Sequence, residues 1–411
     1  MVRASRVPVV AVGVALTGML AMSGASSSLA DTSTAGGSVD GAPTMLDLGT
    51  LPGGTFSAGN AVNASGQVAG TATTASGERR AFRWTAAGGM QDLGTLGGTN
   101  SSAQAINASG EVTGTADTAS GAPHAFRWTP SGGMEDLGTL GGLSSSGNAI
   151  NARGQVAGIA SIPGRASHAF RWTPGRGMED LGSLGEGFSS TASFSSAMND
   201  RGQVVGTSAT STGTSHAFRW TRSLGMQDLG TLDESPSGSG SVSDGWAINA
   251  RGQVVGYATS STGGNHAFRW TASGGMQDLG TLGGRESGAI VINRRGEAAG
   301  YSLLADGRTT HPFRWTPSGG MQDLGTLGGE GLVAIPIPVA TGINDRGEVV
   351  GSSFTAGGER HAYRWTPAGG MEDLGTLGGT DSSAAAINAR SQVTGTAATT
   401  DSRGHAFLWT P

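Results

Sequence analysis

The chain has 411 residues, a formal net charge of −5 at pH 7 and no cysteine. Its 74 glycines and 14 prolines are together about twice the ordinary share, which excludes a mainly helical protein. Without cysteine there is no disulfide, no thiolate zinc site, no catalytic thiol and no lipid-modified cysteine.

The N-terminus has the layout of a secretory signal peptide. Arg3 and Arg6 form a short basic region, residues 7–22 are apolar, and Ser28-Leu29-Ala30 offers small residues for cleavage. A membrane anchor is the alternative, but the apolar run is short for a span and is interrupted by proline and glycine. We therefore predict a signal peptide over residues 1–30 and a secreted, extracellular protein.

The remainder divides into a flexible linker over residues 31–44 and a repetitive region over residues 45–411. Removal of the signal takes away two arginines and no acid, so the mature chain is more acidic still and nucleic acid is not expected as a partner. No later stretch is apolar enough to span a bilayer, and no run of basic residues suggests a membrane surface. We expect no membrane contact after signal removal.

The region from residue 45 repeats one unit eight times. Each unit carries three motifs, which resemble Gly-Met-Gln-Asp-Leu-Gly-Thr-Leu, Ala-Ile-Asn-x-x-Gly-x-Val and His-Ala-Phe-Arg-Trp-Thr. The aspartate of the first motif is at positions 47, 92, 136, 180, 228, 278, 323 and 373. The asparagine of the second is at 63, 107, 151, 199, 249, 293, 344 and 388, and the tryptophan of the third is at 84, 128, 172, 220, 270, 315, 365 and 409.

Four short segments of each unit are typical of β-strands, because they are β-branched or aromatic and are bounded by glycine, proline, asparagine and serine. Residues 107–110 (Asn-Ala-Ser-Gly) and 129–132 (Thr-Pro-Ser-Gly) predict tight type I hairpin turns with glycine in the left-handed position. The link from the aspartate to the next asparagine, of 15 to 21 residues, accounts for nearly all of the variation in length. These links lie opposite the tight turns, so we expect the ligand-binding face on the side of the links.

A four-stranded unit repeated eight times predicts an all-β fold, an eight-bladed β-propeller of antiparallel blades, with a β-solenoid as the alternative. Hairpin register places the arginine of Phe-Arg-Trp opposite the variable residue of Met-x-Asp-Leu, as in Arg127 with Glu135. That polar pair becomes apolar only at Leu46 and Leu408, the first and last copies. A ring closed by the N-terminal outer strand would pair these two leucines, whereas an open solenoid gives no reason for the change.

The His-Ala-Phe-Arg-Trp-Thr stretch at 124–129, with copies that begin at 168, 216 and 266, resembles the signature of the HAF-repeat family of extracellular bacterial repeat proteins. The resemblance covers about residues 45–411, and it departs at Arg80-Ala81-Phe82, His311-Pro312-Phe313, His361-Ala362-Tyr363 and Phe407-Leu408-Trp409. It implies an extracellular location and a repeat architecture, and it transfers no catalytic or ligand-binding residue.

Residues that recur in every unit are expected to be framework. We predict that each histidine of the third motif bonds within its own blade, with the aspartate of Met-x-Asp-Leu as a partner, because histidines one blade apart are too distant to share a zinc ion. Each such aspartate is expected to bond backbone rather than act as a general acid. The repeated tryptophan shares a strand face with the phenylalanine two residues earlier, which predicts packing between adjacent blades.

Ligand contacts are expected where the repeat is broken. The three longest links carry acids and aromatics, and Trp246 is the only tryptophan outside the Phe-Arg-Trp position. Carboxylates accept hydrogen bonds from hydroxyl groups, and an aromatic ring stacks on a sugar. The alternative is that these links are simply solvated. The candidate ligand-binding residues are Trp246, Asp233, Glu234, Asp244, Glu186, Phe188 and Glu330.

Together these features favour a secreted, monomeric, non-enzymatic propeller without cofactor or metal. It would bind an extracellular polysaccharide, cell-wall material or a protein through its variable links, or serve as a scaffold. A hydrolase or lyase with carboxylates such as Asp233 and Glu234 is the alternative, although sequence neighbours seldom oppose each other as acid and base. Calcium in the acidic links is a weaker alternative, because the chain contains no Asp-x-Asp-x-Asp-Gly loop.

Overall fold

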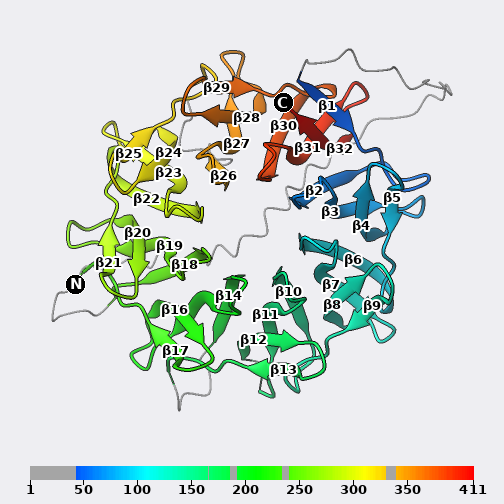
Figure 1. Ribbon diagram of the computed structural model, residues 1–411, viewed down its shortest axis with the longest axis horizontal. Helices are drawn as coiled ribbons and strands as arrows, with labels where there is room; N and C mark the ends of the chain where they lie inside the picture. The colour runs from blue at the N-terminus through cyan, green and yellow to red at the C-terminus, as the bar shows by residue number, and fades with distance from the viewer. Residues whose placement is uncertain (1–42, 165, 186–191, 234–239, 330–338) are drawn as a thin grey trace, which may run out of the picture. The chain divides into compact units, whose positions relative to one another are not determined.

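The computed structural model describes residues 43–411, except for residue 165 and residues 186–191, 234–239 and 330–338. The expected signal peptide and nearly all of the expected linker lie outside the described residues. Pro43–Pro411 form one compact unit. Its described residues form eight four-stranded antiparallel sheets arranged as blades in a ring (Figure 1).

In each blade the strand order in space follows the chain, from the innermost strand to the outermost. Blade 1 contains β2 (Ser57–Val62), β3 (Val68–Thr73), β4 (Arg79–Thr85) and β5 (Gly89–Asp92). Blade 2 contains β6 (Gly97–Ile106), β7 (Val112–Thr118), β8 (Pro123–Thr129) and β9 (Gly133–Asp136). Blade 3 contains β10 (Ser145–Ile150), β11 (Val156–Ser161), β12 (Ser167–Thr173) and β13 (Gly177–Asp180). Blade 4 contains β14 (Ser193–Met198), β15 (Val204–Ala209), β16 (Ser215–Thr221) and β17 (Gly225–Asp228).

The second half of the ring repeats this order. Blade 5 contains β18 (Ser243–Ile248), β19 (Val254–Thr259), β20 (Asn265–Thr271) and β21 (Gly275–Asp278). Blade 6 contains β22 (Gly283–Ile292), β23 (Ala298–Leu304), β24 (Thr310–Thr316) and β25 (Gly320–Asp323). Blade 7 contains β26 (Val339–Ile343), β27 (Val349–Phe354), β28 (Arg360–Thr366) and β29 (Gly370–Asp373). Blade 8 contains β30 (Gly378–Ile387), β31 (Val393–Thr399) and β32 (Gly404–Thr410), with β1 (Thr44–Asp47) as its fourth strand.

The ring is closed as the sequence predicts. Strand β1 pairs antiparallel with β32, and Leu46 is the Cα partner of Leu408. Elsewhere the register sets the arginine of Phe-Arg-Trp opposite the glutamine or glutamate of Met-x-Asp-Leu, as for Arg127 and Glu135. The apolar substitution therefore lies at the junction of the two chain ends, which confirms the eight-bladed ring and excludes the solenoid.

The hairpin turns also confirm the prediction, with one shift. Gly110 has a φ of 77°, as expected for the last residue of the turn between the first and second strands. In the turn between the third and fourth strands the positive φ falls on Gly133, at 71°, one residue beyond the expected Gly132. We call the face formed by these two sets of turns the tight-turn face, and the opposite face, which carries the links between blades, the link face.

The core lies between blades. Phe126 is fully buried, and Trp128, 5% exposed, packs in one cluster with Ala69 and Ala81 of blade 1. The Arg83 guanidinium of blade 1 lies 5.6 Å from the centre of the Trp128 ring. Seven such contacts, at 4.4–5.7 Å, place the arginine of one blade over the tryptophan of the next. The predicted packing role of the tryptophans is confirmed.

Candidate functional site

The seven histidines stabilise their own blades. Each Nδ1 atom lies 2.7–3.1 Å from a carboxylate oxygen of the aspartate in Met-x-Asp-Leu on the neighbouring strand. Blade 1 has Arg80 at this position, with its Nε 3.8 Å from an Asp92 oxygen. The same aspartates also accept a backbone hydrogen bond, as Asp92 does from the Gly94 amide at 2.8 Å. The predicted framework roles of both residues are confirmed.

The eight asparagines connect the blades in a closed circle. Each side-chain amide donates to the backbone carbonyl of the asparagine in the next blade, at 2.9–3.3 Å. Asn388 completes the circle by donating to the Asn63 carbonyl. The Asn63 side-chain oxygen meanwhile accepts from the Ser65 and Gln67 amides, both at 3.0 Å, which fixes its own turn.

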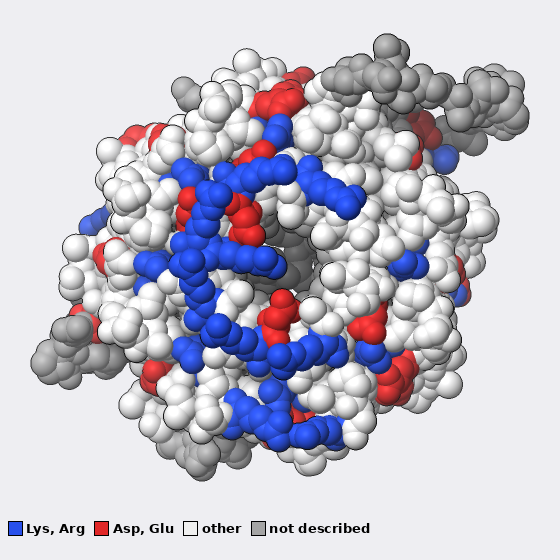
Figure 2. Space-filling model, viewed as in Figure 1, with Lys and Arg blue, Asp and Glu red and all other residues white. Residues whose placement is uncertain are grey.

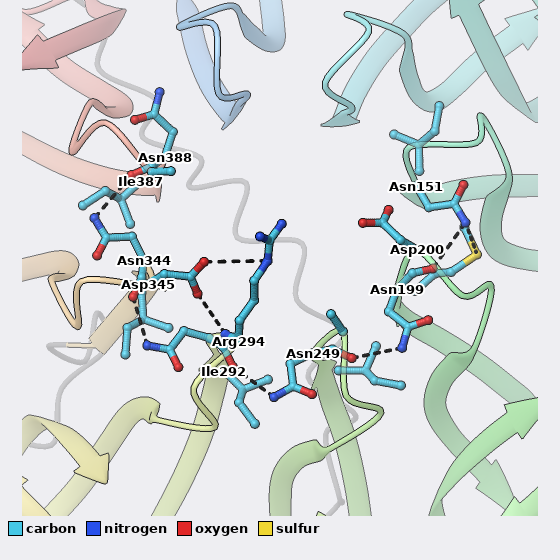
Figure 3. A pocket seen from close by; sticks show the side chains of 17 residues that line it. Asn151, Asn199, Asp200, Asn249, Ile292, Arg294, Asn344, Asp345, Ile387 and Asn388 are labelled. Atoms are coloured by element: carbon cyan, nitrogen blue, oxygen red, sulfur yellow. Dashed lines mark hydrogen bonds and ion pairs between the residues drawn. The ribbon is translucent and has the colours of Figure 1, made fainter.

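A cavity of about 300 Å³ lies inside this circle, lined by the asparagines and apolar strand ends of blades 3 to 8 (Figure 3). Its charged residues bridge neighbouring turns. The Asp345 carboxylate accepts from the Arg294 amide at 2.9 Å and lies 3.7 Å from the Arg294 Nε. The Asp200 carboxylate accepts from the Ala152 amide at 3.0 Å. Each carboxylate of this cavity thus accepts a hydrogen bond from a backbone amide of the preceding blade.

Of the three candidate ligand-binding residues that the structure describes, Asp244 and Trp246 lie together. Glu186, Phe188, Glu234 and Glu330 lie outside the described residues. The Asp233 carboxylate accepts a hydrogen bond from the Ser241 hydroxyl at 3.1 Å, but its proposed hydrolytic partner Glu234 is not described. Asp244 and Trp246 lie together on β18, the innermost strand of blade 5.

We give the name aromatic patch to Phe194, Asp244, Trp246, Tyr257 and Tyr301; Phe194 is the Cα partner of Thr207, whose hydroxyl donates to Asp244. The Trp246 ring meets the Tyr257 ring edge-on at 5.1 Å and the Tyr301 ring at 6.5 Å. All five lie on the inner two strands of blades 4 to 6 (Figure 1). Phe194 is 43% exposed, and the other four are partly exposed.

Gly288 has no side chain, and this leaves room for two rings of the aromatic patch. A Cβ atom on Gly288 would lie 3.0 Å from the Trp246 ring and 2.8 Å from the Tyr301 ring. The glycine on β22 therefore allows the two rings to meet across the junction of blades 5 and 6. A larger residue there would push them apart.

The carboxylate of the patch is held in a poorly solvated position. Burial raises the pKa of Asp244, and a hydrogen bond from the Thr207 hydroxyl of blade 4 offsets this only in part. Burial, with the Asp244 charge as a smaller contribution, raises the pKa of Tyr257 to about 12. Both phenols of the patch therefore remain neutral hydrogen-bond donors at neutral pH.

Tyr257 and Tyr301 were not among the predicted ligand-binding residues. Both occupy the second-strand position that holds threonine in four other blades, at positions 71, 115, 207 and 396. Comparison of the eight units at this strand position, and not only in the links, would have identified both tyrosines.

In the part of the chain that the structure describes, no group of three or more histidines and acids is placed to hold a metal ion. Among the same residues, no helix has the length and apolarity needed to cross a membrane.

Comparison with known proteins gives the fold alone. No family model and no curated protein matches the chain. Among solved structures, a prolyl endopeptidase matches with a TM-score of 0.54 and 12% identity over 78% of this chain and 49% of that one. This chain thus corresponds to about half of the endopeptidase. The BP39L lectin from Burkholderia pseudomallei has a TM-score of 0.44 and 10% identity, over 77% of this chain and 97% of the lectin. The propeller domain of the Trilobed protease from Pyrococcus furiosus has a TM-score of 0.46 and 10% identity, over 78% and 98% of the two chains.

Proposed function

We propose that the protein is a secreted, non-enzymatic binding propeller whose aromatic patch contacts an extracellular polysaccharide. The observation that carries the proposal is the patch itself. Its four rings and one carboxylate occupy inner-strand positions that hold smaller side chains in most other blades. Function in a repeat protein is expected where the repeat is broken, since framework positions recur in every unit.

The chemistry of the patch suits a sugar. The exposed Phe194 ring and the partly exposed Trp246 ring offer apolar surfaces on which the face of a pyranose can stack. The neutral Tyr257 hydroxyl can donate a hydrogen bond and the Asp244 carboxylate can accept one. A few polar groups that converge beside aromatic rings are the usual make-up of a small-molecule or glycan site.

The links support the same location. Strands β14 and β18, which carry Phe194, Asp244 and Trp246, follow two of the three longest links in the chain. In the sequence, both insertions therefore come shortly before strands that carry the patch. The secreted location rests on the N-terminal sequence and on the resemblance to HAF repeats.

The test is retention of residues 31–411 on a panel of insoluble polysaccharides and whole cell-wall material. We expect Trp246→Ala to weaken retention by roughly five- to thirtyfold, because loss of a stacked ring costs on the order of 1–2 kcal/mol. Gln104→Ala is the matched control, since Gln104 is the exposed residue at the equivalent position in blade 2 and should be neutral.

Three results would contradict the proposal. Equal retention of Trp246→Ala and the unsubstituted protein would remove the patch from the binding site. Retention of neither on any polysaccharide would favour a protein ligand. Release of reducing sugars during incubation would restore the hydrolase alternative.

A further inference from the structure

The tight-turn face carries an arc of exposed arginines. The third residue of the turn between the first and second strands is arginine in six consecutive blades and serine in blades 1 and 2. The six are Arg153, Arg201, Arg251, Arg295, Arg346 and Arg390, and all are exposed. Figure 2 shows the basic side chains as an arc that partly surrounds the central hollow. All 25 basic residues of the chain are arginine, although the chain is acidic overall.

Most of these charges are not neutralised within the protein. Among the described residues, only Arg294 of the exposed arginines on this face has a carboxylate within 4 Å, that of Asp345. Burial, with the nearby charge of Arg251 as a second cause, lowers the pKa of Arg269 beneath the arc. Like charges therefore accumulate on one face, which raises the local concentration of anions.

The arc deepens into a pocket between blades 3 and 4. The pocket has a volume of about 510 Å³, within the usual range for ligand sites, and its rim carries Arg153, Arg176, Arg201 and Arg222. Arg176 and Arg222 lie in the turns between the third and fourth strands, where no other blade has an arginine. At these two turn positions of the tight-turn face, the sequence departs from the repeat.

A fifth arginine lines the pocket and is held in place by its neighbours. Arg171 is 7% exposed, and its guanidinium lies 4.4 Å from the centre of the Trp220 ring. One terminal nitrogen lies 2.7 Å from a Glu179 oxygen and the other lies 3.4 Å from the Gly202 carbonyl. Glu179 is the only acid among the described residues that line the pocket, so five guanidinium groups face one carboxylate.

We propose that the tight-turn face, with this arginine pocket at one end of the arc, binds the anionic substituents of an acidic polysaccharide. The flat guanidinium fork matches the oxygens of sulfate, phosphate and carboxylate groups and is more weakly hydrated than an ammonium group. An arc over six blades can meet several substituents along one chain, so that weak contacts add up. This site is separate from the aromatic patch and does not depend on the function proposed for it.

An acidic polysaccharide fits this face better than a nucleic acid. Proteins that hold single strands stack the bases on exposed aromatic rings. In the described part of the chain, the markedly exposed aromatic residues are Phe56 and Phe194, which lie at the link-side ends of β2 and β14. Trp172 and Trp220, the rings nearest the pocket, are buried at 5% and 6% exposure.

The test uses a variant with four substitutions, in which each arginine is replaced by the residue at the equivalent position of another blade. Arg153→Ser and Arg201→Ser introduce the serine of blades 1 and 2, Arg176→Gly introduces the glycine of blade 2, and Arg222→Ala introduces the alanine of blade 1. Each new residue already occupies the equivalent turn position of another blade, so the thermal midpoint should stay close to that of the unsubstituted protein. The matched control removes the same charge from the link face by serine substitution of Arg79, Arg285, Arg308 and Arg403.

The probe is dextran sulfate, measured against neutral dextran, polygalacturonate and a single-stranded DNA oligomer at low and physiological salt. We expect the unsubstituted protein to bind dextran sulfate over neutral dextran, with an affinity that falls as salt rises. The tight-turn variant should lose at least tenfold in affinity, and Trp246→Ala should lose none.

The results that overturn the proposal are distinct. Equal losses in the tight-turn and link-face variants would reduce the effect to net charge. Tighter binding to the DNA oligomer than to both acidic polysaccharides would point to nucleic acid instead. Binding of dextran sulfate no tighter than that of neutral dextran would show that the arc is not a polyanion site.

Discussion

At the scale of the residue, the most regular feature is the pairing of a histidine with an aspartate on the next strand. In blade 8 the pair is His405 with Asp47, at 2.9 Å, and it connects the two ends of the chain. Burial acts to raise the pKa of Asp47, but hydrogen bonds from His405 and the Gly49 amide outweigh it, so the pKa lies below its ordinary value of 3.8. The pKa of Asp228 and of Asp323 is lowered for the same reasons.

This shift predicts a loss of stability in acid. A carboxylate with a lowered pKa in the folded state contributes stability that is present above about pH 4 and is lost as the pH falls through the folded-state value. The triple variant Asp47→Asn/Asp228→Asn/Asp323→Asn should therefore show a shallower decline in the free energy of unfolding below about pH 5. Urea unfolding at a series of pH values measures this decline in the free energy of unfolding. Asp200→Asn, outside these pairs, is the control, and a decline as steep in the triple variant as in the unsubstituted protein would contradict the assignment.

At the scale of the element, each blade depends on one close approach between its first two strands. The first strand shifts register at a bulge, between Gly147 and Ala149 in blade 3. Opposite the bulge, a Cβ atom on Gly158 would lie only 1.9 Å from the Ser146 carbonyl oxygen and 2.7 Å from the Phe170 ring. This explains why the third residue of every second strand is glycine.

Gly158→Ala should therefore destabilise the protein by about 2–3 kcal/mol, the cost of overpacking a close contact. Gly88→Ala is the control, because its new Cβ would meet only the Thr85 hydroxyl, at 3.1 Å, and its effect should stay within about 0.5 kcal/mol. Denaturant unfolding measures both. Equal stability of the two variants would mean that the strands can separate at little cost.

The elements and their pairing could be predicted because departures from a strong repeat are informative. Leu46 and Leu408 are apolar where other units are polar, and that difference alone located the ring closure. The circle of asparagines could not be predicted in the same way. Asn63 is already explained within its own unit as a turn residue, and the carbonyl that its amide reaches belongs to Asn107 of the next blade.

The two candidate sites were only partly predictable for a similar reason. Trp246 and Asp244 stand out in the sequence, whereas Tyr257 joins them only because β18 and β19 are adjacent. The arginine arc forms no basic run in the sequence, since its members are about 40 to 50 residues apart. The ring brings single residues of six blades onto one face, and a repeated turn arginine such as Arg153 looks like framework in the sequence.

At the scale of the whole molecule, repetition places a different recurring group on each of the two faces. The histidine-paired aspartates end the fourth strands at the link face, and the unpaired arginines occupy the turns of the other face. Recurring arginines that have no carboxylate partner raise the local concentration of anionic ligands at their face. The two proposed sites differ accordingly, with stacking and hydroxyl contacts at the aromatic patch and oxyanion contacts at the arginine pocket.

Both sites require a rigid ring, and the ring depends on its closure. The asparagine circle is complete only if Asn388 reaches Asn63, and the eighth blade is complete only if β1 pairs with β32. The closure also places Leu408 against Trp84, where other blades place an arginine over the tryptophan.

The most direct measurement is therefore a cross-link between the chain ends. The protein has no cysteine, so Leu46→Cys/Leu408→Cys introduces a single possible disulfide, between Cα partners whose expected separation suits one. Mild oxidation should shift the monomer to a faster-migrating form on a non-reducing gel, while Gln91→Cys/Leu408→Cys, with the first cysteine at the equivalent position of blade 1, should not. Failure of the first pair to cross-link within the monomer, or cross-linking only between molecules, would contradict the closed ring.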